Sequence, residues 1–345
     1  AGLLFVLPGA LVVLALSMIY AAFGNVPVVE ALFFGIKAAV LVIVVEALLR
    51  IARRALTLRI HWIVAALSFV AIFLFAAPFP VIVFAAALFG YYHVPNASDR
   101  AAFTAPLIAT SRTVQTVGLW LLVWIVPLAV IAAAFGRDHV LSQMGLFFSK
   151  LAVVTFGGAY AVLAYMGQDV VVRYGWLDAG AMLDGLGLAE TTPGPLILVT
   201  EFVGYLAAYR NAGGPPLFMG LLGAFVALWA TFVPCFLWIF AGAPYLEWIT
   251  HQPRLKGALH AITAAVVGVI LNLAIWFALH VFFANVELIQ AGPLKLWMPE
   301  LASLDWRVVA LSAIAAVLIF RRHWGIPAVL AVTSALALLV TFAGA

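Results

Sequence analysis

Charged residues and cysteine are scarce in this sequence of 345 residues. Aspartate, glutamate, lysine and arginine together account for 9% of it, while hydrophobic residues account for 67%. Soluble domains carry roughly 25% charged residues, so this balance excludes an ordinary soluble globular protein. The single cysteine, Cys235, also excludes an internal disulfide framework.

Signatures of catalysis and of metal binding are lacking as well. The seven histidines are scattered, and no two of them share an H-x-x-x-H spacing. The sequence contains no Ser-His-Asp set, pair of metal-binding carboxylates or phosphate loop, so we expect no enzymatic activity and no cofactor. The net charge of +4 is too small to indicate a nucleic-acid partner, but it favours the attraction of anions.

Long uncharged runs dominate what is present. They cover Ala1–Val29, Trp62–Ser98, Thr113–Gly136, Leu151–Gln168, Asn211–Leu246, Gly257–Val286 and Trp324–Ala345. A bilayer core about 30 Å thick needs roughly 20 apolar residues per helix. The mean hydropathy is +1.21, and 11 tryptophans suit the edges of a lipid-facing surface. The sequence therefore predicts an all-α, polytopic membrane protein with about ten to eleven hydrophobic helices.

Proline, glycine and charged residues divide these runs into separate elements. The predicted helices are Leu3–Tyr20, Ala31–Arg50, Trp62–Ala76, Val81–Tyr92, Thr113–Phe135, Gly145–Gly167, Leu217–Phe240, Gly257–Phe283, Trp306–Phe320 and Ile326–Thr341. An amphipathic, charged segment, Gln168–Glu190, leads to a break at Thr191–Pro195. A shorter helical piece, Leu196–Tyr209, follows this break.

An internal repeat relates the two halves of the sequence. Three collinear matches carry it: Ala38–Glu46 with Ala264–Asn272, Trp62–Ser68 with Trp306–Ser312, and Gly2–Leu4 with Gly220–Leu222. The alternative is chance similarity between apolar helices. We divide the chain into a first repeat at 1–95, a connecting loop and helix at 96–144, and a second repeat at 145–345.

The two copies are unequal in length. A stretch from Lys150 onward precedes Gly220 in the second copy and holds most of the polar groups that lie within apolar sequence, whereas one residue precedes Gly2 in the first copy. We therefore expect either a truncated chain or a natural variant whose first repeat lacks this motif block.

Lysine and arginine predict the orientation in the membrane. The basic loop Arg50–Arg59 and the turn Arg321–His323 are both expected to be cytoplasmic. They lie on one side if Gly180–Tyr209 crosses the membrane once, as two half-helices broken at Pro193–Pro195. The two repeats are then inverted, which is an architecture of transporters. A re-entrant segment that returns to its own side is the alternative.

The break at Thr192, Pro193, Gly194 and Pro195 has the features of an anion site. Proline is well tolerated in the first turn of a helix, so Pro195 can open a new helix, and Gly194 permits a sharp turn of the backbone. The N–H groups that follow would point out of a helix N-terminus, which carries a partial positive charge. A plain surface turn is the alternative.

Two carboxyl groups, Glu190 and Glu201, flank the break within apolar sequence. A carboxyl group in a medium of low dielectric constant can take up and release a proton as its environment changes. We expect Glu190 and Glu201 to be the candidates for coupling transport to protons.

Other ionisable residues lie at helical spacing. Asp169 and Arg173 are four residues apart and are expected to pair on one helical face. Glu46 is expected to reach Arg50 in the same way, which would leave Lys37 unpaired within its helix and available as a second anion contact.

Lys150 lies near the start of an otherwise apolar helix, and Gly157 and Gly158 follow two turns later. Lys150 either contributes charge to an anion site or extends to the membrane interface. The glycine pair is either an unwound point that faces a substrate or a place of close helix packing.

A combination of short motifs resembles a known family. The motifs are Phe148-x-Lys150-Leu, Thr155-Phe-Gly-Gly158, Arg173-x-x-Trp176-Leu, and Pro193-Gly-Pro195 with Gly204-Tyr. Together they resemble the chromate ion transporter (CHR) family, and Gly2–Gly9 resembles the helix that follows the same motifs in the first half of that family. The resemblance implies a multi-pass carrier of the bacterial inner membrane with two homologous halves. It also implies chromate export that confers chromate resistance, by proton coupling or exchange.

This resemblance implies a set of substrate-binding residues. The set is Lys150, Phe156, Gly157, Gly158, Arg173, Thr192, Pro193, Gly194 and Pro195. Sulfate shares the shape and charge of chromate, so a carrier of sulfate or another oxyanion is one alternative. Because the motif block before Ala1 is missing, another is a half-site subunit that transports only when paired, as a homodimer or with another half-length chain. The lipid bilayer is the remaining expected partner.

Overall fold

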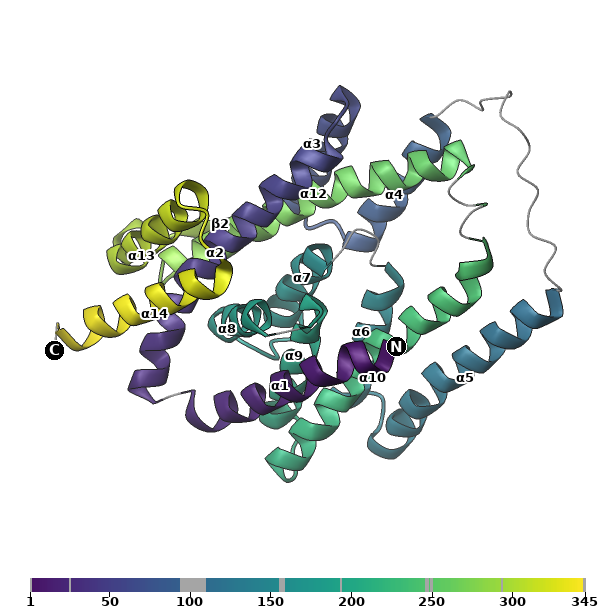
Figure 1. Ribbon diagram of the computed structural model, residues 1–345, viewed down its shortest axis with the longest axis horizontal. Coiled ribbons are helices and arrows are strands. Elements are labelled where there is room, and N and C mark those ends of the chain that lie inside the picture. Colours follow the sequence, from purple (N-terminus) through teal and green to yellow (C-terminus); the bar gives the residue numbers. More distant parts are fainter. Residues whose placement is uncertain are drawn as a thin grey trace.

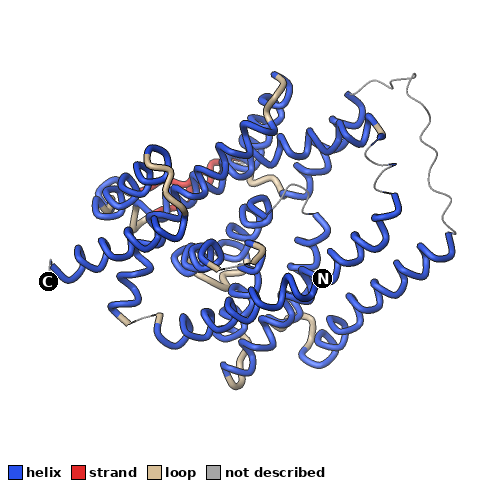
Figure 2. Tube along the Cα trace, in the orientation of Figure 1, coloured by secondary structure: helices blue, strands red, loops and turns tan. Residues whose placement is uncertain are grey.

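The computed structural model describes residues 2–24, 26–93, 110–154, 159–192, 194–245, 248, 251–292 and 294–343. Within these ranges the regular structure is helical apart from one two-stranded hairpin (Figure 2), which confirms the predicted all-α class. The helices are α1 (Gly2–Phe23), α2 (Pro27–Ala55), α3 (Arg59–Phe75), α4 (Phe79–His93), α5 (Thr110–Phe135), α6 (Val140–Val154), α7 (Ala159–Gln168), α8 (Ala179–Thr191), α9 (Val199–Asn211), α10 (Pro216–Gly242), α12 (Pro253–Phe282), α13 (Trp306–Ala316) and α14 (Ile326–Ala343).

Short helical turns and the hairpin complete the described part. They are η1 (Asp169–Arg173), η2 (Leu196–Leu198), η3 (Ala243–Tyr245), η4 (Leu301–Ser303), η5 (Val317–Arg321), β1 (Val286–Ala291) and β2 (Leu294–Pro299). Helices α1, α2, α5, α10 and α12 are each long and apolar enough to cross a membrane. Prolines open three of the long helices, at Pro27, Pro216 and Pro253, where the missing N–H costs nothing.

Helix α12 packs along α3 and α4. Near one end of this group the rings of His260 and His61 lie 6.3 Å apart, and further along Asn272 and Ile72 line one cavity. Helix α12 therefore runs parallel to α3, and α4 returns in the opposite direction.

Helix α2 packs along α13 and α14 in the corresponding way. The Ser312 hydroxyl of α13 donates to the carbonyl of Ala38 at 3.1 Å, and the Ser334 hydroxyl of α14 donates to the carbonyl of Leu32 at 3.2 Å. The long helix of each predicted repeat thus packs against the helical pair of the other repeat.

Three basic segments meet at one end of these helices. Arg54 and His61 line a cleft together with His260, close to the start of α12, and Leu48 lines a second cleft together with Phe320 of η5. Helix α2 ends here whereas α12 begins here, so corresponding helices run in opposite directions, as inverted repeats require. We call this region the basic end; it comprises Arg50–Arg59, Arg254, Lys256, Arg321 and Arg322.

The segment with α8 and α9 does not cross the bundle, contrary to the favoured prediction for Gly180–Tyr209. The Arg210 guanidinium lies 3.6 Å from the Asp178 carboxylate, and the Asn211 side-chain amide donates to the carbonyl of Trp176 at 3.3 Å. The segment therefore returns to the end at which it started, which is the re-entrant alternative. Each helix has 13 residues and is about 20 Å long, too short for a bilayer core of about 30 Å.

The predicted single helix Gly145–Gly167 is also wrong. The rings of Phe147 in α6 and Tyr165 in α7 lie 6.0 Å apart, whereas 18 residues of one helix would separate them by about 27 Å. Helix α7 therefore folds back along α6. Two predicted membrane crossings, by Gly145–Gly167 and by Gly180–Tyr209, are thus absent. Because the loss of two crossings leaves the later segments on their predicted side, Arg53 and Arg321 still lie at one end.

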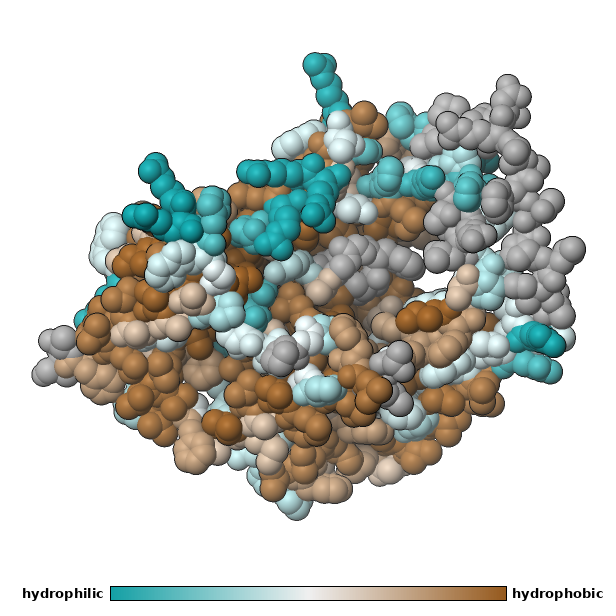
Figure 3. All heavy atoms as spheres, in the orientation of Figure 1, coloured by the Kyte–Doolittle hydropathy of each residue, from teal (hydrophilic) through white to brown (hydrophobic). Residues whose placement is uncertain are grey.

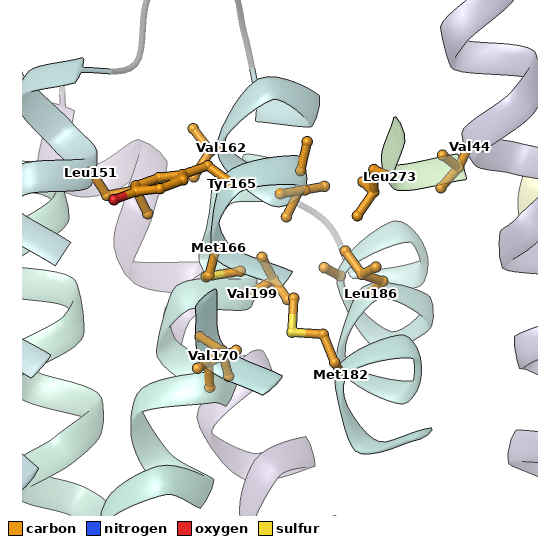
Figure 4. Packing of buried hydrophobic residues seen from close by; sticks show 14 of the residues in the cluster. Val44, Leu151, Val162, Tyr165, Met166, Val170, Met182, Leu186, Val199 and Leu273 are labelled. Atoms are coloured by element: carbon orange, nitrogen blue, oxygen red, sulfur yellow. The ribbon is translucent and has the colours of Figure 1, made fainter. Parts of the chain in front are cut away.

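The two folded-back pairs occupy the middle of the molecule. Figure 1 shows α7, α8 and α9 in the centre of the view, with α1, α2, α6, α10 and α12 around them. Met166, Met182 and Val199 from these three central helices meet in the core shown in Figure 4, where each is fully buried. Non-helical or broken segments are tolerated at membrane depth when protein surrounds them, as it does here.

The outer helices carry an apolar surface. Leu4 and Phe5 of α1 and Leu119 and Leu122 of α5 are each between 61% and 76% exposed. Figure 3 shows hydrophilic atoms gathered along the upper part of one face, while apolar atoms cover most of its lower part. This distribution suits contact of the outer helices with lipid.

Candidate functional site

A charged cavity of about 390 Å³ lies away from the basic end. The turn between α3 and α4, helices α6, α7 and α12, the turn η1 and the strands β1 and β2 enclose it. Its polar lining residues are Lys150, Tyr165, Gln168, Asp169, Arg173, Asn272 and Lys295. Within the described lining, three cationic side chains face one carboxylate, which is an arrangement suited to an anion.

Lys150 is positioned by aromatic packing. It lies one turn before the end of α6, and its ammonium group is 5.9 Å from the centre of the Tyr165 ring. Tyr165 in turn stacks on Phe79 at 5.3 Å and contacts Phe147. An ammonium group over an aromatic face is attracted by the ring, so the folded-back α7 helps to position the exposed Lys150 side chain at the cavity.

Arg173 and Asp169 form the predicted ion pair, with 3.7 Å between the guanidinium and the carboxylate. They lie at the two ends of η1, which has π-helical geometry and continues directly from α7. The Oδ2 atom of Asp169 is buried without a hydrogen-bond partner in the described structure. Single π-helical turns occur frequently at functional sites, and here the turn brings both charges to the cavity.

Lys295 is the cation of the described lining that the sequence analysis did not identify. It lies half-buried on β2, in register with Gln290 of β1. Gly292 has a φ of +63° at the turn of the hairpin, a conformation that glycine adopts without strain. The Gly292-Pro293 dipeptide between two short, mostly apolar stretches was the signal that could have revealed the turn of the hairpin.

The break after α8 lies apart from this cavity. Gly194 has a φ of +134°, which only glycine adopts readily, and it lies against Gly9 of α1. The Thr192 hydroxyl donates a hydrogen bond of 2.7 Å to the carbonyl of Leu188, in the last turn of α8. Pro195 is followed directly by the turn η2, as predicted. None of the described residues Thr192, Gly194 and Pro195 lines the cavity that contains Lys150 and Arg173.

Four of the predicted substrate-binding residues lie outside the described residues. They are Phe156, Gly157, Gly158 and Pro193. Of the others, the structure brings Lys150 and Arg173 together and keeps them separate from the break.

The two coupling candidates lie in different surroundings, Glu190 half-buried and Glu201 buried. Glu190 accepts a hydrogen bond of 2.7 Å from the Tyr160 hydroxyl. Glu201 is 1% exposed, and its Oε2 atom has no hydrogen-bond partner in the part of the chain that the structure describes.

Lys37 is not unpaired, contrary to the prediction. Its ammonium group lies 3.3 Å from the Asp184 carboxylate, which also accepts a 2.7 Å hydrogen bond from the Tyr20 hydroxyl. The predicted pair of Glu46 and Arg50 is confirmed, with a hydrogen bond of 2.6 Å. Sequence spacing identified the pair within one helix but could not identify a partner that lies 147 residues away.

The bundle of apolar helices with two folded-back pairs and a charged cavity defines a multi-pass membrane protein with a transporter architecture. The family model described as Chromate transporter matches residues 1–91 and 142–341. The chain belongs to this chromate transporter family. The unmatched segment 92–141 overlaps most of the predicted connecting region and includes α5.

Named relatives agree with the family. The chromate transport protein of Cupriavidus metallidurans is 31% identical over 285 residues, which cover 80% of this chain and 63% of that protein. The chromate transport protein of Pseudomonas aeruginosa is 32% identical over 278 residues, 78% of this chain and 61% of that protein. A shorter match is the uncharacterized transporter YwrA of Bacillus subtilis, 30% identical over 134 residues, 39% of this chain and 67% of that protein. This chain thus spans less than two thirds of the longer relatives. No solved structure matches it.

Proposed function

We propose that this chain forms the chromate-carrying part of a secondary transporter in the bacterial inner membrane, and that it exports chromate and so confers resistance. The observation that carries the proposal is the cavity that contains Lys150 and Arg173, whose charges are complementary to a tetrahedral oxyanion. The names of the relatives support chromate as the transported ion.

In this proposal the path of the anion includes the backbone N–H groups after Gly194, at the start of the next helical piece, and the charges of Lys150 and Arg173 in the cavity. Hydrogen bonds to a charged partner contribute about 1.5–3 kcal/mol each, so several donors are needed to replace the water around a dianion. The glycine pair Gly157–Gly158 would contribute further backbone donors. Glu190 and Glu201 are the proposed proton-binding groups.

Two alternatives are separable from this proposal. A carrier of sulfate or another oxyanion would use the same charges, because the shape and charge of the two ions are alike. A subunit that transports only when paired, as a homodimer or with another chain, is the second alternative. Measuring flux and subunit stoichiometry on the same purified sample distinguishes these cases.

The test is chromate flux in membrane vesicles that contain the chain. Lys150→Ala and Arg173→Ala should each lower chromate uptake about tenfold or more, because each removes a charged hydrogen-bond donor. Lys256→Ala, which removes a lysine at the basic end, is the matched control and should transport normally. Unchanged flux in both cavity variants at equal protein abundance would place the substrate site elsewhere.

Gly194→Val tests the part of the path at the break after α8. Valine cannot adopt the φ of +134° that Gly194 has without strain of about 1–3 kcal/mol, so the N–H groups that follow would be misaligned. We expect chromate flux to fall while the variant still reaches the membrane. Gly242→Ala is the control because nothing lies within 4 Å of its added methyl group.

A further inference from the structure

The β1–β2 hairpin supplies the third cation of the charged cavity. Lys295 and Trp297 lie two residues apart on β2 and therefore on one face of the strand, and both line the cavity. Leu288, which is paired with Trp297 across the hairpin, lines it as well. One face of the hairpin thus forms a wall of the cavity.

The hairpin is fixed in this position at its base and along one side. The Asn285 side-chain amide donates to the Glu300 carboxylate at 2.8 Å, and the Glu300 amide donates to the carbonyl of Asn285 at 3.0 Å. The Trp297 ring packs against His280 at 5.3 Å and against Trp276 at 6.4 Å, both on α12. These contacts hold β2, and with it Lys295, over the cavity.

Lys295 changes the charge of the cavity from that of a monoanion site to that of a dianion site. On the helical side of the cavity, the charges of Arg173 and Asp169 cancel, because the two groups lie 3.7 Å apart. Lys150 then gives this side a formal charge of +1. Lys295 raises the formal charge of the described lining to +2. In a cleft whose walls have a low dielectric constant, uncompensated charge is costly, so the ion whose charge matches the lining is favoured.

We propose that Lys295 sets the selectivity of this site for divalent over monovalent oxyanions. The inference rests on the proposed function in so far as the cavity is the site of the transported anion. It goes beyond that function because it assigns the choice between anions of similar shape to one residue on the hairpin.

A lysine that merely attracts anions from solution would behave differently. Long-range attraction accelerates the arrival of every anion and disappears as salt screens the charges, over a distance of about 10 Å at 0.1 M. A binding contact within the cavity changes the ratio of affinities for dianions and monoanions and keeps that change at high salt. This ratio is therefore the quantity to measure.

The experiment measures anion binding by calorimetry on the purified chain in detergent and chromate uptake by the same chain in vesicles, both at alkaline pH, where chromate is a dianion. Sulfate and perchlorate serve as a tetrahedral dianion and a tetrahedral monoanion. Lys295→Gln should weaken sulfate binding about tenfold or more, as expected for the loss of a charged donor, and should change perchlorate binding much less. Lys295→Arg should keep the preference for sulfate.

Two controls separate selectivity from folding and from net charge. Lys256→Gln removes the same charge at the basic end and should leave the sulfate-to-perchlorate ratio unchanged. Glu287→Gln alters the hairpin at a residue that does not line the cavity and should also leave this ratio unchanged. The melting temperature of each variant shows whether the protein is folded.

The outcomes distinguish this inference from the proposed function. Equal changes for sulfate and perchlorate in Lys295→Gln, or no change for either, overturn the role of Lys295 even if the wild-type chain transports chromate. Binding that shows the selectivity change without any chromate flux supports the role of Lys295 and overturns transport by this chain. Absence of binding of both anions to the wild-type chain overturns both.

Discussion

Asp184 lies between three helices and is 3% exposed. Its Oδ2 atom accepts a hydrogen bond from the Tyr20 hydroxyl of α1 and pairs with the Lys37 ammonium group of α2. Its Oδ1 atom has no hydrogen-bond partner in the described structure. The desolvation of a buried ion pair offsets much of its attraction, so the pair as a whole adds little stability. Removing one partner alone is costly, because the remaining charge stays buried.

Replacing Lys37 tests this asymmetry. Lys37→Met should lower the free energy of unfolding by about 1–3 kcal/mol, which is less than for a fully buried pair because the Lys37 side chain retains some exposure. The double variant Lys37→Met with Asp184→Asn should recover most of that loss. Thermal unfolding in detergent measures both, and a double variant that is no more stable than the single one would contradict the argument.

At the scale of the element, close backbone contact joins α9 to α10. A methyl group added at Gly204 would lie 2.7 Å from the carbonyl oxygen of Gly223 and 2.5 Å from the Cβ atom of Ala227. Small residues of this kind let membrane helices approach closely. The folded-back pair of α8 and α9 is therefore anchored to a long helix through α9.

Gly223→Ala should weaken this anchor. The added methyl group would meet the backbone of Gly204, which cannot move aside as a side chain can, so we expect a loss of about 1–3 kcal/mol of stability. Gly118→Ala is the matched control: it also lies inside a helix, but nothing lies within 4 Å of its added methyl group. Alanine there should stabilise the protein slightly. Equal melting temperatures for the two variants would show that this contact is not tight.

The sequence predicted the helices but not the direction in which each one runs. The helices were predictable because long apolar runs with proline and glycine at their ends have one interpretation in a membrane. The reversal between α6 and α7 was not, since apolar composition continues through it and does not specify direction. Lys150 and Arg173 could be proposed from motifs, whereas Lys295 could not, because only the three-dimensional fold brings the hairpin to the cavity.

At the scale of the whole molecule, the basic end determines the orientation. Arg53 lies in the last turn of α2, and Arg321 ends η5 at the same end of the bundle. The hairpin follows α12, which starts at the basic end and runs away from it. Positive residues favour the cytoplasmic side, so the hairpin and the charged cavity are expected to face the other side.

Cysteine labelling tests this orientation. In a Cys235→Ala background, Arg53→Cys and Arg321→Cys should react with a membrane-impermeant reagent only from the cytoplasmic side, and Gln290→Cys on the hairpin only from the opposite side. The two arginine positions serve as mutual controls because they lie in different predicted repeats. Reaction of Arg53→Cys and Arg321→Cys from different sides would contradict the arrangement.

The exchanged packing of the long helices has a consequence for how such a chain assembles. Helix α12 relies on α3 and α4, and α2 relies on α13 and α14, so neither segment is a self-sufficient folding unit. Synthesis of α1–α4 leaves α2 without these packing partners until α13 and α14 have entered the membrane. A polypeptide with only one such segment would obtain the missing packing partners only from a second copy inserted beside it in the opposite orientation.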